Sequence, residues 1–138
     1  MFNLNFKNAN ALYIHVPFCS SKCPYCDFYS IKSSEDKIKE YISSLIKEIG
    51  LYSQQLQAKK VKTIYIGGGT PSILSVEGLD KLLNNLSKNF NLLDNIEITM
   101  EANPESLNST KIRKYRELGV NRLSLGAQSF LDKELKFL

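Results

Sequence analysis

The chain has 138 residues, of which 43% are hydrophobic and 23% charged, and its formal net charge is +4. These values are typical of one globular domain or a large part of one, and no apolar run is long enough to cross a bilayer. Residues 1–10 are rich in asparagine and lack the apolar stretch of a secretion signal, so we expect them to form a flexible lead-in. A cytoplasmic location follows as an expectation, because free thiols survive best there.

Strands and helices are predicted to alternate along the chain, each helix marked by apolar residues at three- and four-residue spacing and each strand by a short β-branched or apolar run. The expected elements are strands at 12–16, 61–66, 96–101 and 122–126, and helices at about 35–57, around 79–86, from 109 or 110 to 118, and from 131 onward. We expect Ser33 or Ser34 to cap the first helix and Ser109 or Thr110 the third, with Gly119 ending the third. Regular alternation predicts an α/β fold with a parallel sheet and right-handed crossovers.

All three cysteines of the protein follow the first predicted strand, with the spacing C-x3-C-x2-C: Cys19, Cys23 and Cys26. Three thiolates so arranged can hold three corners of a cubane iron–sulfur cluster and leave the fourth iron without a protein ligand. The odd number argues against a disulfide framework. A zinc site that also used His15 stays open, and so does a thioredoxin-like pair, although that pair would leave Cys19 unexplained.

Ligands of parallel α/β folds bind at the carboxyl ends of the strands, and four features lie at such ends. They are the cysteine loop, the run Gly67–Gly69, Glu101 and Gln128. We expect them to meet on one rim. The glycines would let backbone groups approach a ligand, or simply make a tight turn, and Glu101 ends an apolar strand where a polar ligand or a salt bridge would offset the cost of its charge.

The basic residues are scattered, and their densest segment, 111–116, falls on a predicted helix. A solvated charged face explains that segment better than a nucleic-acid contact does.

Four stretches carry a family resemblance. They are YIHVPFC at 13–19, which leads into the cysteine spacing with Tyr25 before the last thiol, YIGGGTP at 65–71, EANP at 101–104 and NRLSLGAQSF at 121–130. The cysteine spacing resembles the signature of radical S-adenosylmethionine (SAM) enzymes. Together, and in this order, the four stretches resemble the oxygen-independent coproporphyrinogen III oxidase family, from residue 12 to the end of the chain.

The resemblance implies a partial (β/α) barrel of six strands, of which the chain contains four. Residues 1–138 would then be the N-terminal part of a radical SAM core, with the rest of the barrel and a C-terminal domain outside this chain. It also implies a 4Fe–4S cluster on the three cysteines, an electron donor for that cluster, and reductive cleavage of SAM to a 5′-deoxyadenosyl radical. The positions that match SAM contacts of the family are Tyr13, Tyr25, Gly68, Gly69, Thr70, Glu101 and Gln128. For His15 and Arg122 we expect structural hydrogen bonds.

The true oxidases of this family continue with a fourth cysteine two residues after the third, where this chain has Asp27 and then Phe28. That difference favours the branch of HemW-type heme chaperones, which bind heme and deliver it to acceptor proteins. The alternative is a coproporphyrinogen III oxidase. Any heme ligands are expected beyond residue 138 or in another chain.

Overall fold

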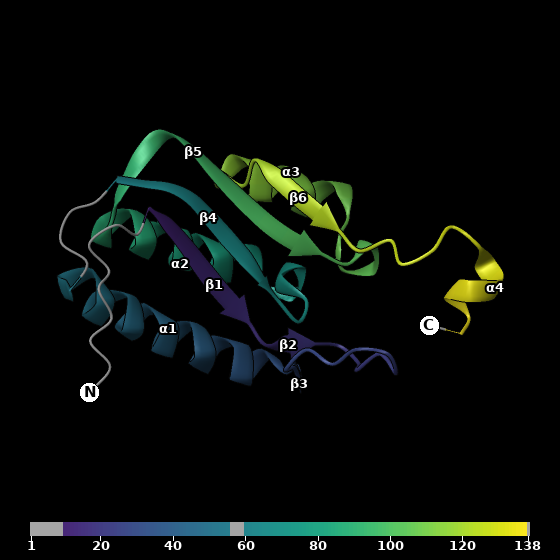
Figure 1. The fold of residues 1–138 in the computed structure, drawn as a ribbon. Coiled ribbons are helices and arrows are strands. Elements are labelled where there is room, and N and C mark those ends of the chain that lie inside the picture. Colours follow the sequence, from purple (N-terminus) through teal and green to yellow (C-terminus); the bar gives the residue numbers. More distant parts are fainter. Residues whose placement is uncertain (1–9, 56–59, 138) are drawn as a thin grey trace.

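The computed structural model describes residues 10–55 and 60–137 (Figure 1). The expected lead-in lies outside the described residues except for Asn10, and so does the expected end of the first helix at 56–57. The described residues contain no helix that is both long enough and apolar enough to pass through a bilayer.

Four parallel strands form the main sheet, in the order β1-β4-β5-β6. Their bounds are β1 Ala11–Val16, β4 Lys60–Gly68, β5 Asn91–Ala102 and β6 Arg122–Leu125. The order of these strands in the sheet is therefore the same as their order along the chain. The helices that connect them cover one face of the sheet (Figure 1). The α/β class with a parallel sheet is confirmed.

The helices are α1 (Glu35–Gln55), α2 (Val76–Asn89), α3 (Ser109–Glu117) and the short α4 (Asp132–Leu135). Two 3-10 turns, η1 (Pro71–Ile73) and η2 (Pro104–Ser106), follow β4 and β5. Ser34 receives a long hydrogen bond of 3.4 Å from the Lys37 amide at the start of α1. The predicted cap of α3 was wrong by one residue, because the Asn108 side chain accepts the Lys111 amide at 2.8 Å. Gly119 ends α3 as expected, with a positive φ of 108°.

All four predicted strands are present, and their bounds need correction: β1 begins one residue earlier than predicted, and β4 extends two residues beyond its predicted end. The third strand begins at Asn91 rather than Ile96, and β6 ends at Leu125, one residue early. Two short parallel strands, β2 (Phe18–Cys19) and β3 (Ile31–Lys32), were not predicted. Two-residue strands carry no period that a sequence pattern can reveal, and the segment 91–95 pairs only with the start of β4, ahead of a shift in register between Val61 and Thr63.

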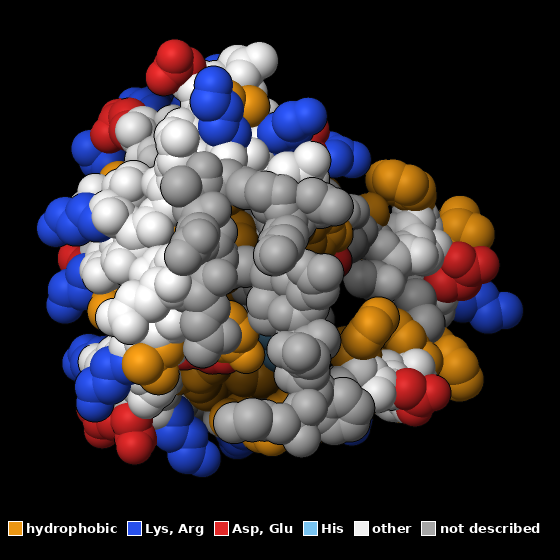
Figure 2. Space-filling view, turned by 60° about the vertical axis from the view of Figure 1, so that its left-hand side comes forward, with side chains coloured by type: hydrophobic (Ala, Val, Ile, Leu, Met, Phe, Trp, Pro, Cys, Tyr) orange, Lys and Arg blue, Asp and Glu red, His pale blue; other side chains and the backbone are white. Residues whose placement is uncertain are grey.

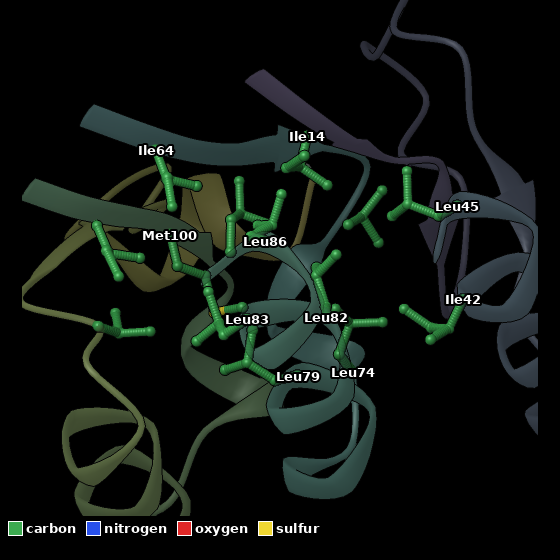
Figure 3. Close-up of a cluster of buried hydrophobic side chains, with 14 of the residues drawn as sticks. Ile14, Ile42, Leu45, Ile64, Leu74, Leu79, Leu82, Leu83, Leu86 and Met100 are labelled. Atoms are coloured by element: carbon green, nitrogen blue, oxygen red, sulfur yellow. The ribbon is translucent and has the colours of Figure 1, made fainter. Parts of the chain in front are cut away.

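The core lies between the sheet and its helices. Alternate strand residues such as Ile14, Ile64 and Met100 pack against leucines of α2, including Leu82 and Leu86 (Figure 3). Because side chains alternate along a strand, the residues between them project from the other face of the sheet. The face toward the helices is therefore apolar, whereas the face away from them carries Tyr13, Tyr65 and Glu101.

In Figure 2, lysine and arginine side chains lie mainly along the left-hand side and the top of the view, with aspartate and glutamate among them. Helix α3 also carries both signs of charge, since Lys114 pairs with Glu117 at 2.8 Å. This mixture of charges agrees with a solvated charged surface.

Tyr115 of α3 is fully buried, and its hydroxyl donates to the carbonyl oxygens of Leu74 at 2.6 Å and Ser72 at 3.3 Å. We expect Tyr115→Phe to lower the free energy of unfolding by about 1–2 kcal/mol, because the Leu74 carbonyl loses its side-chain donor inside the core. Urea denaturation measures the change. Tyr29→Phe, at a side chain that is 72% exposed, should alter stability by less than about 0.5 kcal/mol. Equal midpoints for the two variants would contradict the expectation.

Candidate functional site

The carboxyl ends of the strands meet at one edge of the sheet. Val16 pairs with Gly68 across β1 and β4, and Ala102 pairs with Leu125 across β5 and β6. The cysteine loop, the triple glycine, the segment after Glu101 and the segment that leads to Gln128 all leave from this rim. The expected placement of the four motifs is therefore present in the described residues.

The triple glycine packs directly against the other motifs. A Cβ atom on Gly69 would lie 2.7 Å from the Phe18 carbonyl oxygen and 2.8 Å from the Cys19 sulfur. A Cβ atom on Gly68, whose φ is +123°, would lie 2.9 Å from the His15 ring. Real Cβ atoms do not approach other heavy atoms so closely, so the absence of side chains here is what allows the strand ends to meet.

Hydrogen bonds join the triple-glycine segment to the start of the cysteine loop. The Gly69 amide donates to the Val16 carbonyl at 2.8 Å, and the Thr70 amide donates to the Phe18 carbonyl at 2.7 Å. The Thr70 hydroxyl lies 3.5 Å from the Cys19 sulfur and donates to it. Donors to a cysteine sulfur help to set the potential of a metal centre that the sulfur holds.

The cysteine loop is closed at its base by the β2–β3 pair. The Ile31 amide donates to the Pro17 carbonyl at 2.7 Å, and the Ser33 amide donates to the Cys19 carbonyl at 2.9 Å. Within the loop, the Cys26 amide donates to the Cys23 carbonyl at 3.1 Å and forms a turn. The two ends of the loop are thus fixed next to each other.

All three thiols are free and partly buried. Over residues 10–55 and 60–137, no three His, Cys, Asp or Glu side chains gather as the ligands of a single metal ion would. Thiolates that hold a cubane each bind a different iron and do not converge on one point. The loop carries three free thiols, and the Cys19 sulfur accepts a hydrogen bond from Thr70. These are the ligand type and number that such a cluster requires.

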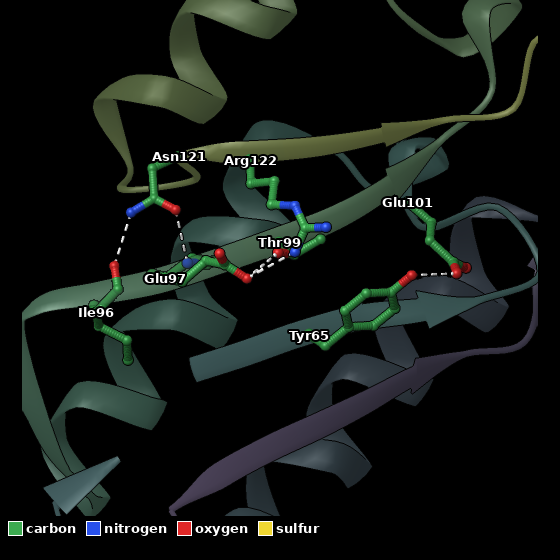
Figure 4. Close-up of polar contacts among 8 residues, drawn as sticks. Tyr65, Ile96, Glu97, Thr99, Glu101, Asn121 and Arg122 are labelled. Atoms are coloured by element: carbon green, nitrogen blue, oxygen red, sulfur yellow. Dashed lines mark hydrogen bonds and ion pairs between the residues drawn. The ribbon is translucent and has the colours of Figure 1, made fainter. Parts of the chain in front are cut away.

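Glu101 lies next to the triple glycine, and both of its carboxylate oxygens accept hydrogen bonds; Figure 4 shows the one from Tyr65. The Tyr65 hydroxyl donates to Oε1 at 2.7 Å, and the Gly68 amide donates to Oε2 at 3.0 Å. The sequence predicted a salt bridge or a polar ligand at this position. In the described residues these two hydrogen bonds offset the cost of placing the charge at the end of an apolar strand.

The two tyrosines with expected SAM contacts are both half-exposed. The Tyr13 ring stacks on the Tyr65 ring, with centroids 6.1 Å apart, and its hydroxyl is 2.9 Å from His15 Nδ1. Burial, and then the charge of Glu101, raise the pKa of Tyr13. Tyr25 is in the cysteine loop, where a hydrogen bond with the Cys23 side chain is the main cause of its raised pKa. The structure thus places Tyr13 against Tyr65, whose hydroxyl contacts Glu101, and Tyr25 beside the Cys23 thiol.

Gln128 follows β6 with a positive φ of 60°. A Cβ atom on Gly126 would lie 2.8 Å from Nε2 of the Gln128 side chain. The Gln128 side chain therefore folds back over its own turn. The Gly126 amide donates to the Ala102 carbonyl at 2.9 Å, which keeps this turn at the rim. The described contacts bring the backbone of the Gln128 segment to the site, and they do not join its side chain to Glu101.

His15 and Arg122 make internal hydrogen bonds, as the sequence predicted. The His15 carbonyl accepts a hydrogen bond from the Tyr41 hydroxyl, in addition to the contact of its ring with Tyr13. Arg122 lies 3.0 Å from Glu97 Oε1 in an ion pair (Figure 4). The hydrogen bond from Thr99, followed by the one from Arg122, lowers the pKa of Glu97.

Sequence reasoning singled out the triple glycine but missed the role of Tyr65, which lies on the same face of β4 as Gly67. A Cβ atom on Gly67 would lie 2.8 Å from the Tyr65 ring and 3.0 Å from Glu101 Oε2. The signal that could have found Tyr65 is the alternation of side chains along a strand. Side chains two residues apart on a strand share a face, so Tyr65 and Gly67 belong to one face, and the parallel register places Glu101 of β5 beside them.

Comparison with known proteins agrees with this geometry. Residues 13–138 match the Radical SAM superfamily. The chain is 41% identical to "Heme chaperone HemW" of Haemophilus influenzae, over 93% of this chain and 35% of the relative, and 43% identical to the protein of that name in Escherichia coli K12, over 93% and 34%. Among solved structures it resembles the coproporphyrinogen III oxidase from Escherichia coli, described as a radical SAM enzyme, with a TM-score of 0.87 and 30% identity over 91% of this chain and 29% of that one.

The chain thus spans about a third of the length of the curated relatives it matches. The family match nevertheless covers β1 from Tyr13 onward, the other three strands of the main sheet and every motif of the rim. The chain belongs to the radical SAM superfamily.

Proposed function

We propose that Cys19, Cys23 and Cys26 hold a 4Fe–4S cluster and that the adjoining rim binds SAM. Membership of the superfamily implies both cofactors. When bound, the reduced cluster supplies the electron for cleavage of SAM, and the protein contributes position and exclusion of water. The observation that carries this proposal is the hydrogen bonding of Gly69 to Val16, and of Thr70 to Phe18 and to the Cys19 sulfur.

The residues of the rim would divide the binding of SAM between them. Gly68, Gly69 and Thr70 leave backbone surface open to the amino-acid part of SAM, and Glu101 would accept hydrogen bonds from its ammonium group. Tyr13 would lie near the cluster side of the ligand, and Tyr25 would offer its ring or backbone to the adenine. Gln128 would reach SAM after its side chain turns away from Gly126.

We further propose that the whole protein, of which residues 1–138 form the N-terminal part of the radical SAM core, is a cytoplasmic heme chaperone that binds heme and transfers it to acceptor proteins. The support is the identity of 41% and 43% to proteins named as heme chaperones. The cysteine motif adds to it, since Phe28 stands where a fourth thiol would be. The heme ligands would be supplied outside this chain.

A coproporphyrinogen III oxidase is the second candidate, favoured by the structural likeness to the Escherichia coli oxidase. The test uses the full-length protein, anaerobically reconstituted with iron and sulfide. We expect it to bind heme in a spectroscopic titration, to activate a heme-free acceptor, and to leave coproporphyrinogen III unchanged. Conversion of that substrate to protoporphyrinogen IX would overturn the chaperone assignment in favour of the oxidase.

A further inference from the structure

We propose that Tyr65 is a positioning residue of the SAM site, because its hydroxyl fixes the carboxylate of Glu101 in the orientation that receives the ligand. The inference rests on the proposed function, in which Glu101 contacts SAM. It adds a residue that makes no expected contact with the ligand and acts through another side chain.

Two donors hold the Glu101 carboxylate at both of its oxygens. The 2.7 Å distance from the Tyr65 hydroxyl to Oε1 lies within the range for a hydrogen bond from a hydroxyl to a charged carboxylate. The Gly68 amide holds Oε2 at 3.0 Å, from the adjacent strand end. One such bond would leave the carboxylate free to rotate about its Cγ–Cδ bond, whereas two bonds, one at each oxygen, fix its plane.

The carboxylate so held can still accept hydrogen bonds. Each carboxylate oxygen has two lone-pair directions, so Glu101 retains capacity beyond the bonds from Tyr65 and Gly68. Its side chain is partly exposed at the rim, where a ligand ammonium could reach it. The geometry is therefore prepared before SAM arrives, which reduces the ordering cost of binding.

The ring that carries the hydroxyl lies close to two neighbours, of which Tyr13 stacks on it. One neighbour is the Tyr13 ring, nearly parallel to it at an interplanar angle of 26°. The other is Gly67, where a Cβ atom would come within 2.8 Å of the Tyr65 ring. Gly67 thus leaves room for Tyr65, and Tyr65 in turn directs Glu101 toward the triple-glycine segment (Figure 4).

A purely structural role for the hydroxyl predicts a different result from a positioning role. Glu101 is within reach of solvent, so water can replace the lost donor and stability should change little. The orientation of the carboxylate, in contrast, would no longer be fixed. The two roles separate when SAM affinity and stability are measured on the same variant.

The test uses the full-length, cluster-loaded protein and compares wild type with Tyr65→Phe, which keeps the ring and removes the hydroxyl. We expect the dissociation constant of SAM to rise by about 5- to 10-fold, the effect of losing one hydrogen bond to a charged group when it acts through a neighbour. Iron content, the cluster spectrum and the melting temperature should equal those of wild type. Tyr29→Phe, which removes an exposed tyrosine hydroxyl, serves as the matched control and should leave SAM affinity unchanged.

A double-mutant cycle with Glu101→Ala, which removes the acceptor of the Tyr65 hydroxyl, gives the decisive readout. If Tyr65 acts through the carboxylate, Tyr65→Phe should change SAM affinity by less than about 2-fold once Glu101 is replaced. Unchanged affinity in Tyr65→Phe alone, an equal loss in both backgrounds, or a parallel loss of iron would each overturn the inference while the proposed function stands. Failure of the wild-type protein to bind SAM would overturn both.

Discussion

Replacement of any one of Cys19, Cys23 or Cys26 by alanine is expected to reduce the iron content of the anaerobically purified, full-length protein to background. A cubane held by three thiolates has no spare protein ligand, so the loss of one leaves two irons without a protein sulfur. The loop cannot supply a replacement, because the sequence contains no fourth cysteine. The expected effect is therefore loss of the cluster in all three variants rather than a graded decrease.

Iron and sulfide analysis, together with the visible absorption spectrum, measures this result. Ser20 and Ser21 are exposed residues of the same loop, and the variants Ser20→Ala and Ser21→Ala should retain the cluster. These controls distinguish the loss of a ligand from damage to the loop. Retention of iron in any cysteine variant would remove that residue from the ligand set. Stoichiometric zinc in place of iron in the wild-type protein would refute the cluster and restore the zinc interpretation.

The parts of the fold that follow from long periodic patterns were predictable. Helix α2 and strand β4 carry apolar residues at regular spacing over several turns or alternations, and a pattern of that length distinguishes a helix from a strand. The meeting of the motifs at one rim was also predictable, because parallel strands align their carboxyl ends whatever their side chains are. Topology alone thus places Cys19 and Glu101, which are far apart in the sequence, at the same rim of the sheet.

The details that depend on register and side-chain contacts were not predictable. The β2–β3 pair is held by hydrogen bonds from Ile31 and Ser33 to residues before the loop, and no local pattern encodes such a closure. The partner of Glu101 depends on how β4 and β5 align, since a shift of one residue would place Tyr65 on the face toward the helices. The rotation of Gln128 toward Gly126 depends on a left-handed backbone conformation that is uncommon outside glycine.

Gly69→Ala is expected to lower the free energy of unfolding by about 3 kcal/mol and to impair loading of the cluster. The reason is steric. The new methyl group would overlap the Phe18 carbonyl oxygen at 2.7 Å and the Cys19 sulfur at 2.8 Å, and the nearest atom belongs to the backbone, which cannot rotate away. Relief requires β2, which consists of Phe18 and Cys19, to move away from the end of β4. This movement strains the hydrogen bond from the Thr70 amide to Phe18 and displaces Cys19. Stability and cluster content should therefore fall together.

Gly50→Ala provides the matched control, because it makes the same chemical change where a Cβ atom meets nothing within 4 Å. Gly50 lies inside helix α1, where alanine is the better helix former, so this variant should gain about 0.5–1 kcal/mol and load its cluster normally. The two substitutions should thus change stability in opposite directions, as read from urea denaturation of the full-length protein. A Gly69→Ala variant with wild-type stability and iron content would mean that β2 and the end of β4 do not approach each other as closely as described. The contact between the triple glycine and the cysteine loop, on which the assignment of the rim as the SAM site depends, would then be lost.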